Sequence, residues 1–260
     1  MAALEADNLL GPDDPAPFEV YNAGGASPFL LLGDHAGAAI PASLKSLGLS
    51  PEDRGRHIAL DIGVEGLGQM LACELDCPFL HQIYSRLVID CNRHSGRADA
   101  VPEISDRTYI PGNRNLQDSA RSTRIESIHE PYHAAISKML DDRRFQGRAT
   151  VLVSLHSFTP ILNGSTRPWD VGILYWRGRT NFALGLRDAL ARQAGVVVGD
   201  NVPYAMDETD YTVPYHAFGR ALPYVEIEVK QSLIDDPQGQ AVWAARLGTA
   251  AREALERTAL

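Results

Sequence analysis

Residues 149–157 read ATVLVSLHS, a short apolar and β-branched run that ends in a histidine and a serine. Val, Thr and Leu side chains pack well on a pleated surface, so the run predicts a buried strand. In open α/β sheets, ligands bind beyond the carboxyl ends of the strands. His156 and Ser157 therefore fall where a functional site is expected.

Strands and helices are predicted to alternate along the rest of the chain. The other predicted strands are 28–33 (PFLLLG), 79–90 (one long strand or two short ones), 170–176, 195–200 and 223–231. The predicted helices are 62–75, 123–144 (broken or started by Pro131), 180–194 and 238–258. This alternation is typical of an α/β protein with a helix-flanked, mostly parallel sheet.

The composition is that of an ordinary globular protein with an acidic surface. Of 260 residues, 45% are hydrophobic and 22% are charged, and the formal net charge is −9. Because no block of Lys or Arg is present, nucleic acid is not expected as a partner. Residues 1–20 are acidic and proline-rich and are predicted to form a surface arm, and 21–260 a single domain.

The cysteines and the N-terminal sequence give an expectation for the cellular location of the protein. Cys73, Cys77 and Cys91 are odd in number, and no basic-then-apolar leader or long apolar run accompanies them. Reduced thiols, a cytoplasmic location and no membrane partner are therefore predicted.

Histidines at two strand ends predict a metal centre. His35 follows the strand 28–33, and His156 ends the strand 149–155. Two histidines and one carboxylate form a ligand set for catalytic zinc. The carboxylate is Asp61, Asp34 or Glu65.

A general base is predicted on the strand 223–231. Glu226 and Glu228 share one face of this strand, and either could take a proton from an activated water. The same pair could also form a solvated face, and Asp61 could simply cap the helix that follows it.

The segment 84–93, YSRLVIDCNR, carries unusual polarity for a predicted strand. Arg86 and Asp90 share one strand face and could form a structural ion pair. Asn92 and Arg93 fall just past the strand end, where they are predicted to bind a substrate carboxylate.

Two further segments are candidates for the pocket. Asn201 and His216 follow the strand 195–200 and are expected in the crevice at the strand ends. Asn201 is predicted to bind substrate. His216, together with Arg86, is predicted to stabilise the tetrahedral oxyanion. The long polar segment 94–122, with Arg97, Arg114 and Arg121, either forms a pocket wall or is a surface excursion.

Six motifs in order resemble the N-formylglutamate amidohydrolase family, in particular its branch of predicted amidohydrolases. They are LLLGDHAGAAIP, HIALDIG, YSRLVIDCNR, LVSLHSFTP, GDNVPY and YTVPYHAFGRALPYVEIEVKQSLI, and the likeness covers about residues 18–234.

The resemblance implies a three-layer α/β/α fold with a mixed, mostly parallel central sheet, similar to zinc carboxypeptidases and phosphorylase/hydrolase-like. It implies hydrolysis of the amide bond of an N-formyl or N-acyl amino acid such as N-formyl-L-glutamate, as in histidine catabolism. It further implies that His35 and His156 match the metal histidines, Asn92-Arg93 the carboxylate-binding pair, and Glu228 the family glutamate.

The chain also departs from the related patterns. Ala38 stands where the carboxypeptidase HxxE motif has its glutamate, so Asp61 is assigned as the third ligand of zinc, with other divalent metals open. Lys230 and Ser232 replace an arginine and an aspartate near Glu228. A carboxypeptidase or deacylase, or a non-catalytic carboxylate-binding protein with a decayed metal site, are the alternatives, and a homo-oligomer is left open.

Overall fold

The computed structural model describes residues 9–258, and within them seven strands form one central sheet. In spatial order they are β1 (Phe18–Tyr21), β3 (Phe79–Gln82), β2 (Phe29–Gly33), β6 (Val151–Phe158), β11 (Tyr224–Lys230), β9 (Val171–Leu174) and β10 (Val198–Asp200). Only the β1–β3 and β11–β9 pairs of this sheet are antiparallel. The predicted mixed, mostly parallel sheet is confirmed.

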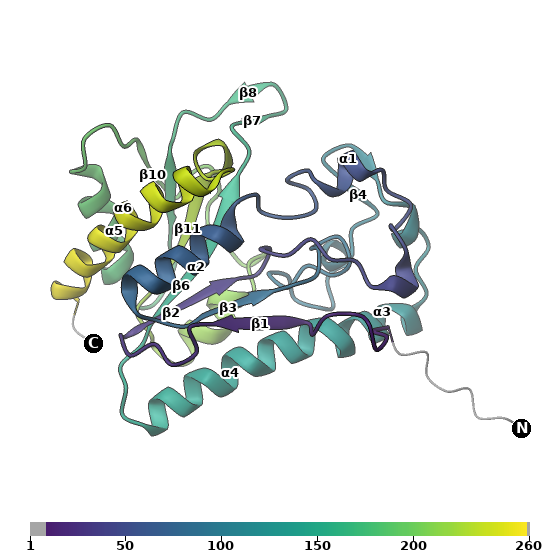
Figure 1. The fold of residues 1–260 in the computed structure, drawn as a ribbon, viewed down its shortest axis with the longest axis horizontal. Helices are drawn as coiled ribbons and strands as arrows, with labels where there is room; N and C mark the ends of the chain where they lie inside the picture. The colour runs from purple at the N-terminus through teal and green to yellow at the C-terminus, as the bar shows by residue number, and fades with distance from the viewer. Residues whose placement is uncertain (1–8, 259–260) are drawn as a thin grey trace, which may run out of the picture.

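Helices cover both faces of the sheet and complete three layers (Figure 1). The helices are α1 (Pro51–Arg54), α2 (Val64–Leu75), α3 (Asp118–Arg124), α4 (Glu130–Phe145), α5 (Asn181–Ala191) and α6 (Pro237–Glu256). Successive strand side chains point to opposite faces, so Phe29 and Leu31 pack toward α2, α5 and α6, whereas Leu30 and Leu32 pack toward α4. Burial on both faces explains why β2 is apolar throughout.

The turn before α2 depends on glycine. Gly63 has a φ of +82°, and a Cβ at this position would lie 2.0 Å from the carbonyl oxygen of Ile234. Only glycine can adopt this conformation at such close approach without strain. The turn fixes the start of α2 and, with it, the position of Asp61 two residues earlier.

The prediction of a strand over 79–90 is wrong beyond Gln82. Residues 84–93 form successive turns, in which Val88 N donates to Ser85 O and Asp90 N donates to Ala100 O. The apolar residues of this segment are still buried, among them Leu87. The hydrophobic pattern therefore predicted burial correctly, but the backbone groups of this segment form their hydrogen bonds outside the sheet.

The segment 94–122 is ordered by short elements rather than by one long one. It contains a hairpin of β4 (Ile104–Ser105) and β5 (Thr108–Tyr109), flanked by single 3-10 turns. A second small hairpin, β7 (Ile161–Leu162) with β8 (Ser165–Thr166), follows β6.

The helix predicted over 123–144 begins earlier, with α3, and reaches α4 through the π-helical turn Ile125–His129. Pro131 lies in the first turn of α4, where its missing N–H is tolerated. The proline therefore marks the beginning of α4 without interrupting the path of the chain.

Residues 1–8 of the predicted N-terminal arm lie outside the described part of the chain. Farther along, Leu9 is buried, and Tyr84 donates a hydrogen bond to Pro15 O. The edge strand β1 begins at Phe18. The sheet thus starts inside the segment predicted as an arm.

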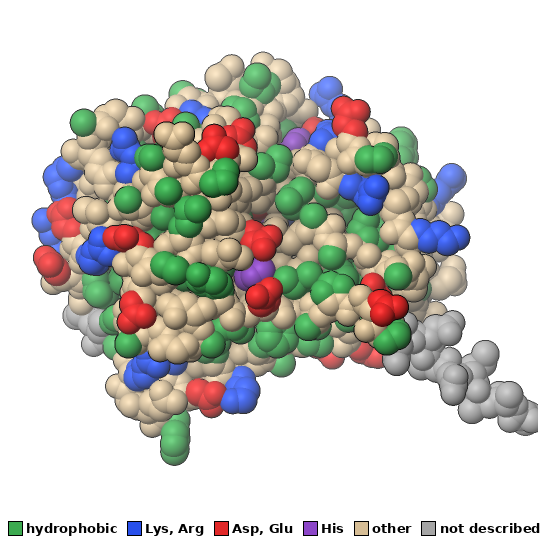
Figure 2. All heavy atoms as spheres, in the orientation of Figure 1, with side chains coloured by type: hydrophobic (Ala, Val, Ile, Leu, Met, Phe, Trp, Pro, Cys, Tyr) green, Lys and Arg blue, Asp and Glu red, His purple; other side chains and the backbone are tan. Residues whose placement is uncertain are grey.

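The surface offers no element suited to crossing a bilayer: none of the helices within residues 9–258 has both the length and the apolar character required. On the face drawn in Figure 2, acidic and basic side chains are interspersed. All three cysteines are free thiols.

Candidate active site

The site is built on the α4-facing side of β6 and β11. Ser154 and His156 alternate with apolar residues on β6, and Glu226 and Glu228 do the same on β11. The parallel register pairs Glu226 with Ser154 and Glu228 with His156. Because the exposed fractions of Glu226 and Glu228 are only 3% and 6%, these residues do not form a solvated face.

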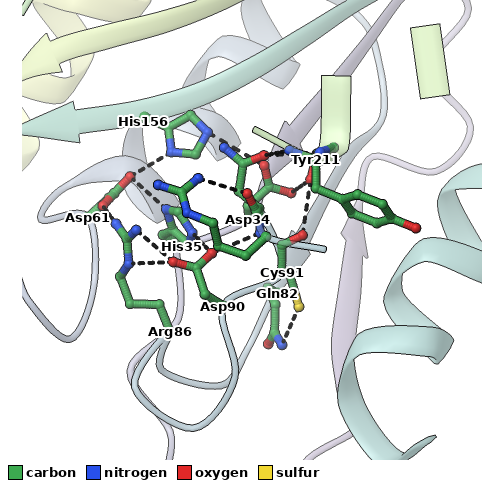
Figure 3. Close-up of polar contacts among 12 residues, drawn as sticks. Asp34, His35, Asp61, Gln82, Arg86, Asp90, Cys91, His156 and Tyr211 are labelled. Carbon is green, nitrogen blue, oxygen red and sulfur yellow. Dashed lines mark hydrogen bonds and ion pairs between the residues drawn. The ribbon is translucent and has the colours of Figure 1, made fainter. Parts of the chain in front are cut away.

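His35, Asp61 and His156 converge in space (Figure 3). The two imidazole rings lie 4.9 Å apart between centroids. Oδ2 of Asp61 lies 2.9 Å from Nδ1 of His156 and 3.5 Å from Nδ1 of His35. One ligand atom from each residue lies within 4.8 Å of the other two, and all three residues are buried.

The other two carboxylates considered as third ligand are placed differently. Oδ1 of Asp34 accepts hydrogen bonds from Tyr132 Oη at 2.8 Å and Thr212 Oγ1 at 3.0 Å, and its Oδ2 lies 3.5 Å from Nε2 of His156. Glu65 is exposed on α2. Of the three candidates, Asp61 is the one that contacts both histidines.

A second layer of charges orients His35. Nε2 of His35 lies 2.7 Å from Oδ1 of Asp90, and Arg86 donates to Oδ2 of Asp90 from Nε at 3.2 Å and from Nη2 at 2.7 Å. Because the Asp90 carboxylate can only accept, Nε2 of His35 carries the proton of the neutral ring and donates it to Oδ1 of Asp90, and Nδ1 carries the lone pair.

This tautomer leaves an unusual contact at the centre of the site. Nδ1 of His35 is buried without a hydrogen-bond partner among the described residues, and it faces an oxygen of Asp61. Two acceptors that face each other in a buried site repel unless a cation or a proton lies between them. Two imidazoles and a carboxylate, with carboxylates behind the imidazoles, fit the donor set of a divalent cation.

The carboxyl groups of the site differ in pKa because burial and the neighbouring charges act on them to different extents. Burial alone would raise the pKa of Asp61, but the adjacent His35 and His156 hold it well below its usual range. Burial raises the pKa of Glu228 to about 7, against the opposing charge of His156, and raises that of Glu226 well above its usual value. Glu228 can therefore exchange a proton near neutral pH.

These residues open onto a cavity of about 500 Å³, whose lining also includes Arg86, Asn92 and Arg93. Nη1 of Arg93 donates to Asn92 O at 2.9 Å and lies 3.4 Å from Oδ1 of Asp210. Asn92 Oδ1 accepts from the backbone N–H groups of Tyr211 and Thr212, both at 3.0 Å. Asn92 thus fixes the loop whose Thr209 and Asp210 contact Arg93.

The segment 94–122 supplies part of the cavity wall through Asp99, Pro102, Ser105 and Asp106. Of its three arginines, Arg97 forms an ion pair with Asp99 at 2.8 Å. Residues between Asp99 and Asp106 therefore form part of the pocket wall, whereas Arg114 lies exposed outside it.

The structure places two predicted site residues elsewhere. His216 lies in the π-helical turn Pro214–Phe218, stacked on His133 with Nε2 3.0 Å from Nδ1 of that ring, and does not line the cavity. Asn201 has a φ of +51° and turns its Oδ1 back to accept from Tyr175 N, beyond the end of β9. Both side chains form hydrogen bonds in their local structure, and neither lines the cavity.

Sequence reasoning missed the hydrogen-bonding partners behind the site. Ser154 could have been found, because it lies two residues before His156 and a strand repeats its faces every two residues. Tyr132 and Thr212, which hold Asp34, come from distant segments with no local signal.

A three-layer α/β fold that gathers imidazoles and carboxylates in a cavity at strand ends defines the class of the protein as an α/β enzyme with a hydrolase-type site. The model of the family described as N-formylglutamate amidohydrolase matches residues 27–235. The chain therefore belongs to the N-formylglutamate amidohydrolase family, whose members are hydrolases acting on amides.

Two solved structures share this fold. A gene product of Agrobacterium tumefaciens is 32% identical, with a TM-score of 0.92 over 95% of this chain and 98% of that one. The N-formylglutamate amidohydrolase from Ralstonia eutropha JMP134 is 19% identical, with a TM-score of 0.65 over 94% of this chain and 98% of that one, and it supports the fold. No curated protein sequence matches significantly.

Proposed function

We propose that the protein is a metal-dependent amidohydrolase that cleaves the amide bond of an N-formyl or N-acyl amino acid, such as N-formyl-L-glutamate. The observation that carries the proposal is the contact between the unpartnered Nδ1 of His35 and the carboxylate of Asp61, beside Nδ1 of His156. These three atoms would hold a divalent cation, for which zinc is the first candidate.

When bound, the cation would supply a Lewis acid for the scissile carbonyl and lower the pKa of a water ligand. The chain's own residues then provide binding and proton transfer.

Glu228 is the proposed general base and acid. Its Oε2 is buried and has no hydrogen-bond partner among the described residues, so it is available to accept a proton from water. A carboxyl group with a pKa of about 7 can also return this proton to the leaving amine. Glu226 is the weaker candidate, because burial raises its pKa well above its usual value and disfavours the charged form that a base requires.

Arg93 and Asn92 are proposed to bind the substrate carboxylate. The guanidinium of Arg93 lies in the cavity wall, with 23% of the side chain exposed, and its contacts to Asp210 at 3.4 Å and Asp99 at 3.6 Å are long. A substrate carboxylate could replace these contacts with shorter, paired hydrogen bonds.

Arg86 is proposed to stabilise negative charge on the carbonyl oxygen during reaction. Its Nη1 lies 3.5 Å from Oδ1 of Asp61, while Nε and Nη2 remain on Asp90. The ion pair holds the guanidinium in place, so that little reorganisation is needed.

Metal analysis and substrate assays test the proposal. Protein purified without chelator should bind about one equivalent of zinc, and His35→Ala and His156→Ala should lose it together with the hydrolysis of N-formyl-L-glutamate. N-acetyl amino acids and dipeptides, assayed in parallel, separate a deformylase from a broader deacylase or carboxypeptidase. Failure to bind any divalent metal, together with absence of hydrolysis, would favour a non-catalytic carboxylate-binding protein.

A cytoplasmic location and a place in histidine catabolism are part of the same proposal. The free thiols support the first and the family substrate supports the second.

A further inference from the structure

A second cavity lies at the opposite end of the strands that carry the active site. Its volume is about 570 Å³, and its wall includes Thr150 and Pro223, which immediately precede β6 and β11. His156 lies six positions after Thr150 along the chain of β6, which corresponds to about 20 Å of extended chain. In Figure 1 this region lies near the carboxyl end of α4. A ligand bound here cannot reach the active-site residues.

Four arginines line this second cavity, which we call the arginine pocket: Arg144, Arg148, Arg179 and Arg220. No acidic side chain is among the described residues that line it, although the whole chain has a net charge of −9. The concentration of positive charge is therefore local and runs against the overall charge of the protein.

Carboxylates neutralise little of the charge on three of these arginines. Arg148 donates to the backbone oxygen of Gly25 at 2.8 Å, and no carboxylate of residues 9–258 forms an ion pair with it. Arg220 lies 3.2 Å from Asp141, whose side chain is 63% exposed, so water screens this pair. Arg144 forms no ion pair within the described residues.

A fifth arginine lies directly behind the pocket wall. Arg143 is only 3% exposed and donates from Nε to Thr150 Oγ1 at 2.9 Å and from Nη2 to Ala149 O at 3.3 Å. Its Nη1 is buried without a hydrogen-bond partner among the described residues. Burial and the neighbouring charge of Arg148 lower its pKa to about 10. Arg143 therefore adds a buried positive charge to the pocket.

We propose that the arginine pocket binds a small anion that carries at least two negative charges, on phosphoryl or carboxylate groups. Guanidinium groups present paired donors that match the oxygen spacing of phosphate and carboxylate. The volume lies within the range of small-molecule sites, roughly 300–1,000 Å³. An anion would relieve the mutual repulsion of the arginines, which solvent alone relieves only in part.

Isothermal titration with inorganic phosphate and with succinate, at constant ionic strength, tests the proposal on the full chain. Saturable binding of at least one of the two is expected, and acetate should bind weakly or not at all. Binding of phosphate alone assigns a phosphoryl ligand, and binding of succinate alone assigns a dicarboxylate.

The double variant Arg144→Gln/Arg220→Gln should weaken binding at least about tenfold, a loss of the size expected when charged hydrogen bonds are removed. The matched control Arg54→Gln/Arg107→Gln removes the same net charge at α1 and at the turn between β4 and β5, where neither residue lines the pocket, and should bind like the wild type. Equal weakening in both variants, or no saturation up to about 10 mM, would overturn the proposal.

A measurement on the wild type does not depend on the folding of any variant. Phenylglyoxal modifies accessible arginines, and peptide mapping reports which of them react. The bound anion should protect Arg144 and Arg220 and leave Arg54 unprotected. Protection of all three to the same extent, or of none, would contradict a built site.

Discussion

Replacing Asp90 by asparagine tests whether the site is organised around a metal. Oδ1 of Asp90 contacts Nε2 of His35 at 2.7 Å and accepts from Asn92 N at 2.9 Å, while Oδ2 accepts two hydrogen bonds from Arg86. An amide has a single acceptor oxygen, so in either orientation the introduced side chain would point its NH₂ group at donors. The substitution keeps the shape of the side chain and removes one half of the network.

Two magnitudes follow from this geometry. Loss of the carboxylate behind a metal-binding histidine typically lowers metal affinity about 10- to 100-fold, which is about 1.4–2.8 kcal/mol. Removal of one partner from the largely buried pair with Arg86, whose side chain is 26% exposed, should lower the free energy of unfolding by about 3 kcal/mol. Arg86 would then be drawn toward Asp61 and compete with the cation.

Competition with a chromophoric chelator measures the zinc affinity, and urea denaturation measures stability. The control is Asp99→Asn, because Asp99 lines the same cavity and pairs with Arg97 but contacts neither histidine. If Asp90→Asn binds zinc within about threefold of the wild type, or if the control loses as much affinity, the reasoning fails.

The pH dependence of this stability difference has a defined sign. Burial alone would raise the pKa of Asp90, but the charge of Arg86 holds this pKa well below its usual range in the folded protein. Its charged form therefore stabilises the fold above the unfolded pKa of about 4 and loses this contribution as the pH falls through the folded value. The gap in stability between wild type and Asp90→Asn should be full at pH 6 and should shrink in acid.

Glu228→Gln should retain metal and lower kcat about 10²- to 10⁴-fold. Because the base form is active, wild-type kcat/KM should fall as the pH drops below the Glu228 pKa, which a bound cation would lower from about 7. An unchanged acid limb of the pH profile in the variant would assign the general base to another residue. Arg93→Gln should raise KM about tenfold or more for substrates with a free carboxylate and leave KM for the corresponding carboxamide unchanged; equal effects on both would remove the carboxylate-binding role. Arg124→Met should lower the free energy of unfolding by about 3 kcal/mol in urea denaturation. The reason is that the buried guanidinium donates to Val88 O at 2.9 Å and to Asn113 Oδ1 at 2.7 Å. A loss below about 1 kcal/mol would show that water replaces the guanidinium as hydrogen-bond donor.

Local sequence predicted the central strands well. The run 29–33 is apolar on both faces because helices cover both faces of the sheet. The run 151–158 is buried throughout, with Ser154 and His156 as polar residues on the face that carries the site. The strand predicted over 79–90 is wrong beyond Gln82 because the apolar residues that follow are buried in irregular backbone, where Asp90 N donates to Ala100 O and not to a neighbouring strand. Hydrophobicity reports burial, and it does not report which backbone partners are available.

The candidate site divides in the same way. Parallel strands end at a common edge, so His35 and His156 could be expected at one site from their positions after two strands. Asp61 was assigned as third ligand from the sequence, but the geometric reason to prefer it to Asp34 and Glu65 came from the fold, which brings its carboxylate to both rings through the Gly63 turn.

The sequence by itself determined the strand pattern, the buried faces and the residue types that gather at the strand ends, because these follow from local periodicity and side-chain chemistry. Only the tertiary structure decided that Asn201 and His216 turn away from the cavity and that Asp90 supports His35. It also decided that arginines from separate segments meet at the far end of the sheet. These outcomes depend on contacts between residues far apart in the chain, and no local pattern encodes the side-chain directions that produce them.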